Sequence, residues 1–151
     1  MTAATIEPTL LQGRDLLYFD LHGDPGKSWW YGLINRGMVS ERIAALHADQ
    51  VSGLDLWGTV VFAATCHAGD PGNPMAQAFM DAGAIVIAGE GKNYGPPGGR
   101  LYGAPLLGLW LRRGLELGWS VAAALRLAKT MVRMAGKMAK DTVGFQLLMR
   151  D

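Results

Sequence analysis

Three short apolar runs, each ending in a loop rich in glycine, constrain the fold of this chain more than any other feature. They are DLLYFDL at 15–21, TVVFAAT at 59–65 and GAIVIAG at 83–89. Runs of this length that stop at Gly and Pro are typical of β-strands entering loops. Because polar and apolar residues do not alternate within them, they indicate a sheet that is covered on both faces.

Helical segments are predicted to lie between and after these strands. We expect four of them, over residues 41–50, 74–82, 105–117 and 120–140. The first, second and fourth follow residues that can cap a helix N-terminus, which are Ser40, Asn73 and Ser120. Residues 144–149 are predicted to form a last short strand. Alternating strands and helices favour a three-layer α/β fold with a mostly parallel sheet.

Composition points to one globular domain over residues 1–151. Half of the residues are hydrophobic, 18% are charged, and the formal net charge is +1. This balance is typical of a packed core, and it gives no reason to expect nucleic acid as a partner. No apolar run approaches the roughly 18–20 residues of a membrane span, and the first residues do not resemble a secretory signal. We therefore expect a cytoplasmic protein with no membrane association.

One cysteine and one histidine stand where a reaction site is expected. His22 and Cys66 each follow a predicted strand directly. In open α/β sheets, sites form beyond the carboxyl ends of the strands. A thiol becomes a nucleophile near neutral pH when a base or a cation lies beside it, and an imidazole supplies either. Gly23 can turn the chain tightly, and its N–H and that of Cys66 are candidate oxyanion donors.

Several other polar residues near the strand ends have two readings each. Asp24, Asp70 and Glu90 follow strand ends, so they either line a substrate pocket that selects a basic residue or cap loops. His67 adjoins the cysteine but should point away from it, which suggests a structural role or a place at the pocket rim.

Metal and nucleotide chemistry are disfavoured by the spacing of the residues. Cys66, His67 and His22 lack the CxxC or HxxxH spacing of metal ligands, so no metal site is predicted. The loop EGKNYGPPGGR at 90–100 lacks the GxxxxGK[ST] pattern of a phosphate-binding loop. It is a better candidate for a specificity loop, and no cofactor is expected.

The two motifs resemble those of a known enzyme family. LHG at 21–23 and ATCHAGD at 64–70 are similar to the His-Gly and Cys motifs of caspase-like, clan CD cysteine peptidases. Their spacing, 66 − 22 = 44 residues, is near the roughly 50 residues noted for caspases. Ala68 stands where caspases proper have glycine and Gly69 follows, so the form is nearest to CHAT, gingipain-like and legumain-like domains. AFMDAGAIVIAG at 78–89 and FQLLMRD at 145–151 are similar to the later segments of a CHAT domain.

The resemblance covers about residues 15–151 and carries expectations about fold and activity. It implies a caspase-like sheet whose last strand is antiparallel. It also implies endopeptidase activity on peptide or protein substrates, with Cys66 as nucleophile and His22 as general base and acid. The alternatives are a catalytically idle caspase-like scaffold or protein-interaction module, and an unrelated α/β binding domain.

The family usually places two strands and a helix before the strand that carries the histidine, and only 14 residues precede 15–21 here. The N-terminal strands are therefore expected to be shortened or missing, which leaves 15–21 near a sheet edge. An apolar edge strand is a template for pairing with another chain, so we expect a homodimer or a partner chain at this edge. The alternative is that residues 4–12 fold back as a short substitute strand.

Overall fold

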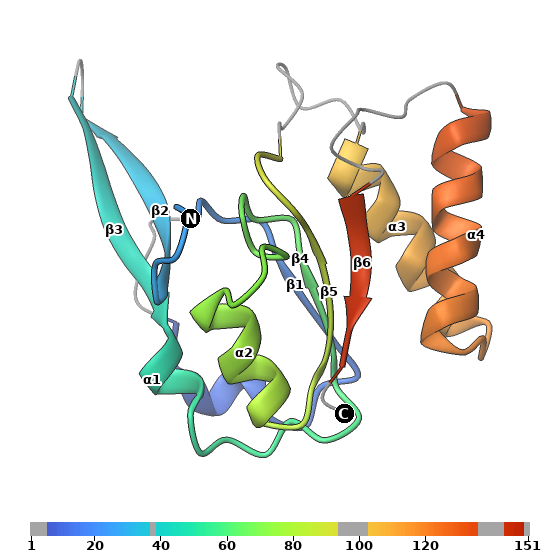
Figure 1. Ribbon diagram of the computed structural model, residues 1–151, viewed down its shortest axis with the longest axis horizontal. Helices are drawn as coiled ribbons and strands as arrows, with labels where there is room; N and C mark the ends of the chain where they lie inside the picture. Colours follow the sequence, from blue (N-terminus) through green and yellow to red (C-terminus); the bar gives the residue numbers. More distant parts are fainter. Residues whose placement is uncertain (1–5, 37–38, 94–102, 136–143, 150–151) are drawn as a thin grey trace.

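The computed structural model describes residues 6–36, 39–93, 103–135 and 144–149 and has a three-layer α/β fold (Figure 1). The strands of its main sheet stand in the order β1 (Leu16–Phe19), β4 (Val60–Ala63), β5 (Ile85–Gly89) and β6 (Phe145–Leu148). The first three run parallel, and β6 pairs antiparallel with β5. The predicted mostly parallel sheet with an antiparallel last strand is confirmed.

The sheet separates two apolar cores, as its continuous apolar strands predict. Val61 and Ala63 of β4 belong to the core on one face, together with Phe79. Val60 and Phe62 of the same strand belong to the core on the other face. All four residues of β4 are buried, so both faces of this strand are covered.

Three of the four predicted helices are present. They are α2 (Pro74–Asp81), α3 (Gly103–Glu116) and α4 (Val121–Met134), and α2 covers one face of the sheet while α3 and α4 cover the other (Figure 1). Asn73 caps α2, because its Oδ1 accepts hydrogen bonds from the N–H groups of the two residues after Pro74 at 3.0 Å. Ser120 caps α4 in the same way. The part of the predicted last helix beyond 135 lies outside the described residues.

The predicted helix over 41–50 is wrong. This segment is a strand, β3 (Val39–His47), which pairs antiparallel with β2 (Trp29–Arg36), and only the short α1 (Ala48–Val51) is helical. The two strands form a hairpin that extends away from the main sheet (Figure 1). Trp30 and Leu46 are cross-strand partners, and they are 1% and 0% exposed. The apolar residues of 41–50 have a helical spacing, but burial against the aromatic strand β2 stabilises the extended conformation instead.

β1 lies at the edge of the main sheet, where it pairs with β4. The described residues before it do not form the alternative fold-back strand. Pro8–Leu11 forms a 3₁₀ turn, η1, and the N–H of Ile6 donates to the carbonyl of Ala45 in β3 at 2.8 Å. Within the described part of the chain, no helix combines the length and apolar character that a membrane span requires.

Candidate functional site

His22 and Cys66 leave the sheet side by side. Phe19 and Ala63 are paired in the parallel register of β1 and β4, and each of the two candidates stands three residues after its strand's last residue. Both line one cavity of about 140 Å³ at the carboxyl end of the sheet. The other lining residues are Asp20, Leu21, Ala64, Asn93, Ala104 and Pro105. The sequence-based placement of the two residues at one edge of a parallel sheet agrees with this geometry.

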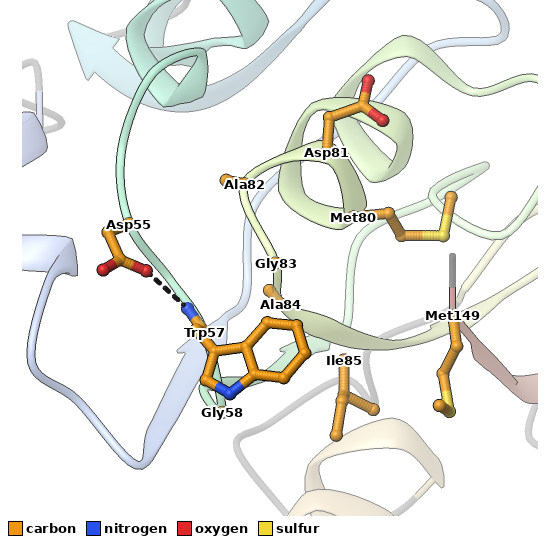
Figure 2. A pocket seen from close by; sticks show the side chains of 10 residues that line it. All are labelled: Asp55, Trp57, Gly58, Met80, Asp81, Ala82, Gly83, Ala84, Ile85 and Met149. Carbon is orange, nitrogen blue, oxygen red and sulfur yellow. Dashed lines mark hydrogen bonds between the residues drawn. The ribbon is translucent and has the colours of Figure 1, made fainter. Parts of the chain in front are cut away.

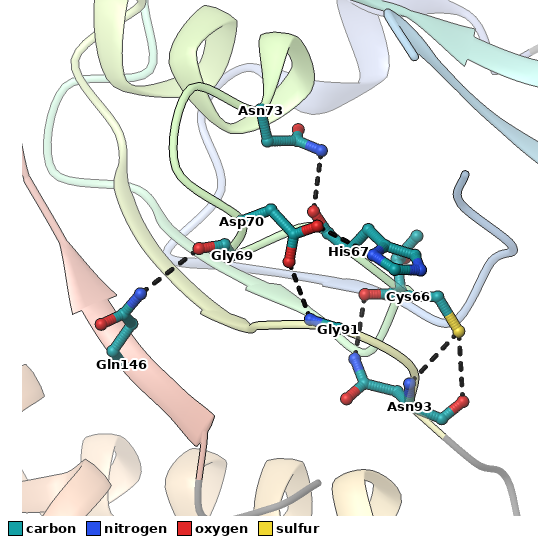
Figure 3. A network of polar contacts seen from close by, with 9 residues as sticks. Cys66, His67, Gly69, Asp70, Asn73, Gly91, Asn93 and Gln146 are labelled. Carbon is teal, nitrogen blue, oxygen red and sulfur yellow. Dashed lines mark hydrogen bonds and ion pairs between the residues drawn. The ribbon is translucent and has the colours of Figure 1, made fainter. Parts of the chain in front are cut away.

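The thiol of Cys66 is half-buried and lies against the main chain of Asn93 (Figure 3). Its Sγ accepts a hydrogen bond from the Asn93 N–H at 3.2 Å and donates one to the Asn93 carbonyl oxygen at 3.3 Å. The side-chain amide of Asn93 in turn donates to the Thr65 carbonyl at 2.9 Å, which fixes this residue beside the thiol. The hydrogen bond to the Asn93 carbonyl uses the thiol proton, so this arrangement is that of a protonated thiol.

The imidazole of His22 is exposed and stacks on Tyr31 of the hairpin. The ring centroids are 5.4 Å apart and the planes are inclined by 25°. The two residues also form an isolated antiparallel bridge. Its two hydrogen bonds run from the His22 N–H to the Tyr31 carbonyl at 2.8 Å and from the Tyr31 N–H to the His22 carbonyl at 3.0 Å. The hairpin that sequence reasoning missed therefore contacts a candidate catalytic residue.

Gly23 packs against the segment that carries the cysteine. A side-chain carbon at this position would overlap the carbonyl oxygen of Cys66 and lie 2.8 Å from Cγ2 of Thr65. The glycine is thus required by the close approach of two backbones, a reason different from the tight turn expected from the sequence. This approach brings the chain after β1 against the chain after β4. The role of the Gly23 N–H as an oxyanion donor stays a prediction.

His67 and Asp70 hold the loop after Cys66 to the loop after β5 (Figure 3). Nδ1 of His67 lies 2.8 Å from Oδ2 of Asp70, while Oδ1 of Asp70 accepts a hydrogen bond from the Gly91 N–H at 2.7 Å. The Asn73 side chain donates to the His67 carbonyl at 2.8 Å. His67 has a left-handed φ of 61°, which is uncommon for a residue with a side chain. These contacts indicate a structural role for His67.

The three carboxylates proposed from the sequence as substrate ligands are engaged elsewhere. Asp24 pairs with Arg42 at 2.7 Å, and Glu90 accepts a hydrogen bond from Gln146 at 3.0 Å. Asp70 is bound as described above, and none of the three lines the 140 Å³ cavity. Asp20 does line it, and its carboxylate makes no hydrogen bond or ion pair within the described part of the chain. Asp20 was not singled out from the sequence, although it is a charged residue inside an apolar run.

A larger and more open cavity of about 530 Å³ lies at the opposite end of the sheet (Figure 2). Figure 2 shows Trp57, Met80, Ile85 and Met149 around it, and the Trp57 side chain is 86% exposed. Asp55 there accepts a hydrogen bond from the N–H of Trp57 at 3.1 Å. This cavity has no thiol or imidazole in its lining, so it lacks the chemistry of the first.

No protein-family model matches the chain, and a search of curated proteins finds no match. Among the residues that the structure describes, no three His, Cys, Asp or Glu side chains lie close enough together to hold a metal ion. Function is therefore inferred from the geometry of the cavity that holds Cys66 and His22.

Proposed function

We propose that this protein is a cysteine endopeptidase-type hydrolase of the caspase-like kind, which acts on peptide or protein substrates. The observation that best supports this is that Cys66 and His22 line one cavity at the carboxyl ends of two adjacent parallel strands. The antiparallel β6 also agrees with the fold that the resemblance implies. The protein contributes side chains and main-chain groups to this chemistry, and the other reactant besides the substrate is water. A reducing cytoplasmic location would keep the thiol free.

In the proposed reaction, the Cys66 thiol turns from Asn93 and transfers its proton to His22. The thiolate then attacks the peptide carbonyl carbon, and the N–H groups of Gly23 and Cys66 stabilise the oxyanion that forms. The C–N bond breaks as the His22 imidazolium protonates the leaving amine, which leaves a thioester on Cys66. His22 next takes a proton from water, and the hydroxide attacks the thioester carbon. The C–S bond then breaks, the carboxylic acid product leaves, and the His22 imidazolium returns its proton to the Cys66 thiolate.

Alkylation of the single cysteine tests the dyad. The pKa of a free cysteine thiol is about 8.5, so little thiolate is present at about pH 6–7 without a supporting group. Because the proposed dyad supplies one, we expect iodoacetamide to modify Cys66 in this range roughly tenfold faster than a free thiol. His22→Ala should remove this excess, because the imidazole then no longer supports the thiolate. The rate is measured as a function of pH by mass spectrometry of the intact chain.

Two variants control this measurement. Cys66→Ser should abolish labelling, since the chain has one cysteine, and His47→Ala should leave the rate unchanged, since His47 lies in the hairpin outside the cavity. A wild-type profile with a single inflection near pH 8.5 would contradict the proposal. That result would instead favour the idle scaffold, in which the Asn93 main chain simply holds a neutral thiol.

We propose that a second chain binds at the sheet edge formed by β1. β1 is an edge strand, and Tyr18 within it is 43% exposed. Light scattering after size-exclusion chromatography should therefore show a dimer at micromolar concentration, with amides of residues 15–21 exchanging more slowly as the dimer forms. A stable monomer with slow exchange over 15–21 would show that the chain protects this edge by itself.

A further inference from the structure

His22 is in contact with a buried tyrosine that the proposed reaction does not use. Tyr31 is 6% exposed, and its ring stacks on the imidazole. The main-chain N–H of each of the two residues donates a hydrogen bond to the carbonyl of the other. A histidine that acts as general base works best when a third group fixes the plane of its ring. Among the described residues, no carboxylate forms a hydrogen bond or ion pair with the His22 imidazole, and Asp24, two positions further along the chain, pairs with Arg42.

The hairpin holds Tyr31 in place from several sides. Its hydroxyl donates to Oδ1 of Asp24 at 3.3 Å, and the guanidinium carbon of Arg42 lies 4.7 Å from the centre of its ring. The Trp29 ring lies 5.1 Å from it. Burial raises the pKa of Tyr31, and the nearby Asp24 carboxylate adds to this rise, so the phenol stays a neutral donor near neutral pH.

Strand alternation gives Tyr31 its direction. Trp30 and Tyr31 are neighbours in β2, and successive residues of a strand point to opposite faces. The register of the hairpin also shifts at this point, where Ala45 of β3 has no cross-strand partner in β2. Trp30 packs in the core against Phe19 and Phe79, at centroid distances of 5.3 Å and 5.6 Å, whereas Tyr31 meets His22 outside that core.

We propose that Tyr31 is the positioning residue of this site: its aromatic face fixes the ring plane of His22 for proton transfer with Cys66. This role rests on the proposed function. It belongs to the ring and not to the hydroxyl, because the ring makes the stacking contact and the hydroxyl binds Asp24. Tyr31 is then the one residue through which the β2–β3 hairpin contributes to the proposed reaction.

The test compares aromatic and non-aromatic residues at position 31 in the full chain. Tyr31→Leu should lower the rate of Cys66 alkylation by iodoacetamide at about pH 6.5 roughly tenfold, to the level of His22→Ala. Tyr31→Phe should stay within about twofold of wild type, since it keeps the aromatic face. Tyr31→Met fills the space with a flexible side chain and serves as the non-aromatic variant if the leucine variant does not fold.

A double-mutant comparison separates positioning from general destabilisation. In the His22→Ala background, Tyr31→Leu should have no further effect on the alkylation rate, because the tyrosine acts through the imidazole. A further tenfold loss there would show a merely structural role and overturn the proposal. A His22-dependent rate that Tyr31→Leu leaves unchanged would overturn the role of Tyr31 alone. Equal rates for wild type and His22→Ala would overturn this role and the proposed function together.

Discussion

A Gly23→Ala variant should lose the roughly tenfold excess in Cys66 alkylation that His22 provides, and it should unfold at a lower temperature. The added methyl group would overlap the Cys66 carbonyl oxygen and press on Thr65. Overpacking of this kind typically costs about 1–3 kcal/mol. The backbones after β1 and β4 must move apart to relieve it. This movement separates His22 from Cys66, so the imidazole no longer supports the thiolate.

The measurement combines iodoacetamide kinetics with thermal unfolding. For a domain of this size, each kcal/mol corresponds to roughly 2–4 °C in Tm. Gly144→Ala is the matched control, because a side-chain carbon there would meet Glu90 at an ordinary 3.6 Å and Gly144 is exposed. That variant should behave like wild type. Unchanged rate and Tm in Gly23→Ala would show that the two backbones can separate without loss, contrary to our interpretation of the site.

The proposed peptidase should prefer lysine or arginine at the substrate position before the cleaved bond. Asp20 lines the cavity with Cys66 and His22 and has no ionic partner within the described residues, so a cationic side chain can pair with it. Asp20 is exposed, and an exposed charge pair is worth about 0.2–1 kcal/mol, which corresponds to roughly 1.5–5-fold in rate. Asp20→Asn should remove most of this preference.

Peptidyl electrophiles that differ only in that residue measure the preference as labelling rates of Cys66. Arginine, lysine, aspartate and leucine make a sufficient set. Glu90→Gln is the control, since this carboxylate was a candidate from the sequence but lies outside the cavity, where it binds Gln146. Faster labelling with aspartate or leucine than with arginine would exclude Asp20 as the selecting group.

The main sheet was predictable from the sequence because buried parallel strands appear as unbroken apolar runs. Residues 15–21, 59–65 and 83–89 each contain one such strand, β1, β4 and β5. The hairpin was not predicted, because the apolar residues of 41–50 fit a helical period. Their packing partner is β2, an aromatic strand earlier in the chain, and the spacing within 41–50 does not reveal it. The signal for it was present in the two runs 29–36 and 39–47, which are separated by two residues that begin with Gly37.

The candidate dyad was predictable because few residue types can act as nucleophile and base. Its surroundings were not, because they depend on contacts between distant segments. Asn93 meets the thiol through its main chain, which any residue type possesses. Tyr31 reaches His22 only through the hairpin. Asp20 lines the cavity because β1 ends at Phe19, two residues before the end of the apolar run 15–21.

The pairing of β1 with β4 also bears on how the chain acquires its chemistry. These strands are parallel neighbours, yet the entire β2–β3 hairpin and α1 lie between them in the sequence. Hairpins form from local contacts within microseconds, whereas parallel pairs must first close a long loop and are intrinsically slow to form. His22 and Cys66 follow directly on these two strands, so they meet only when that late, non-local step is complete. A partly folded chain therefore carries its thiol without its base.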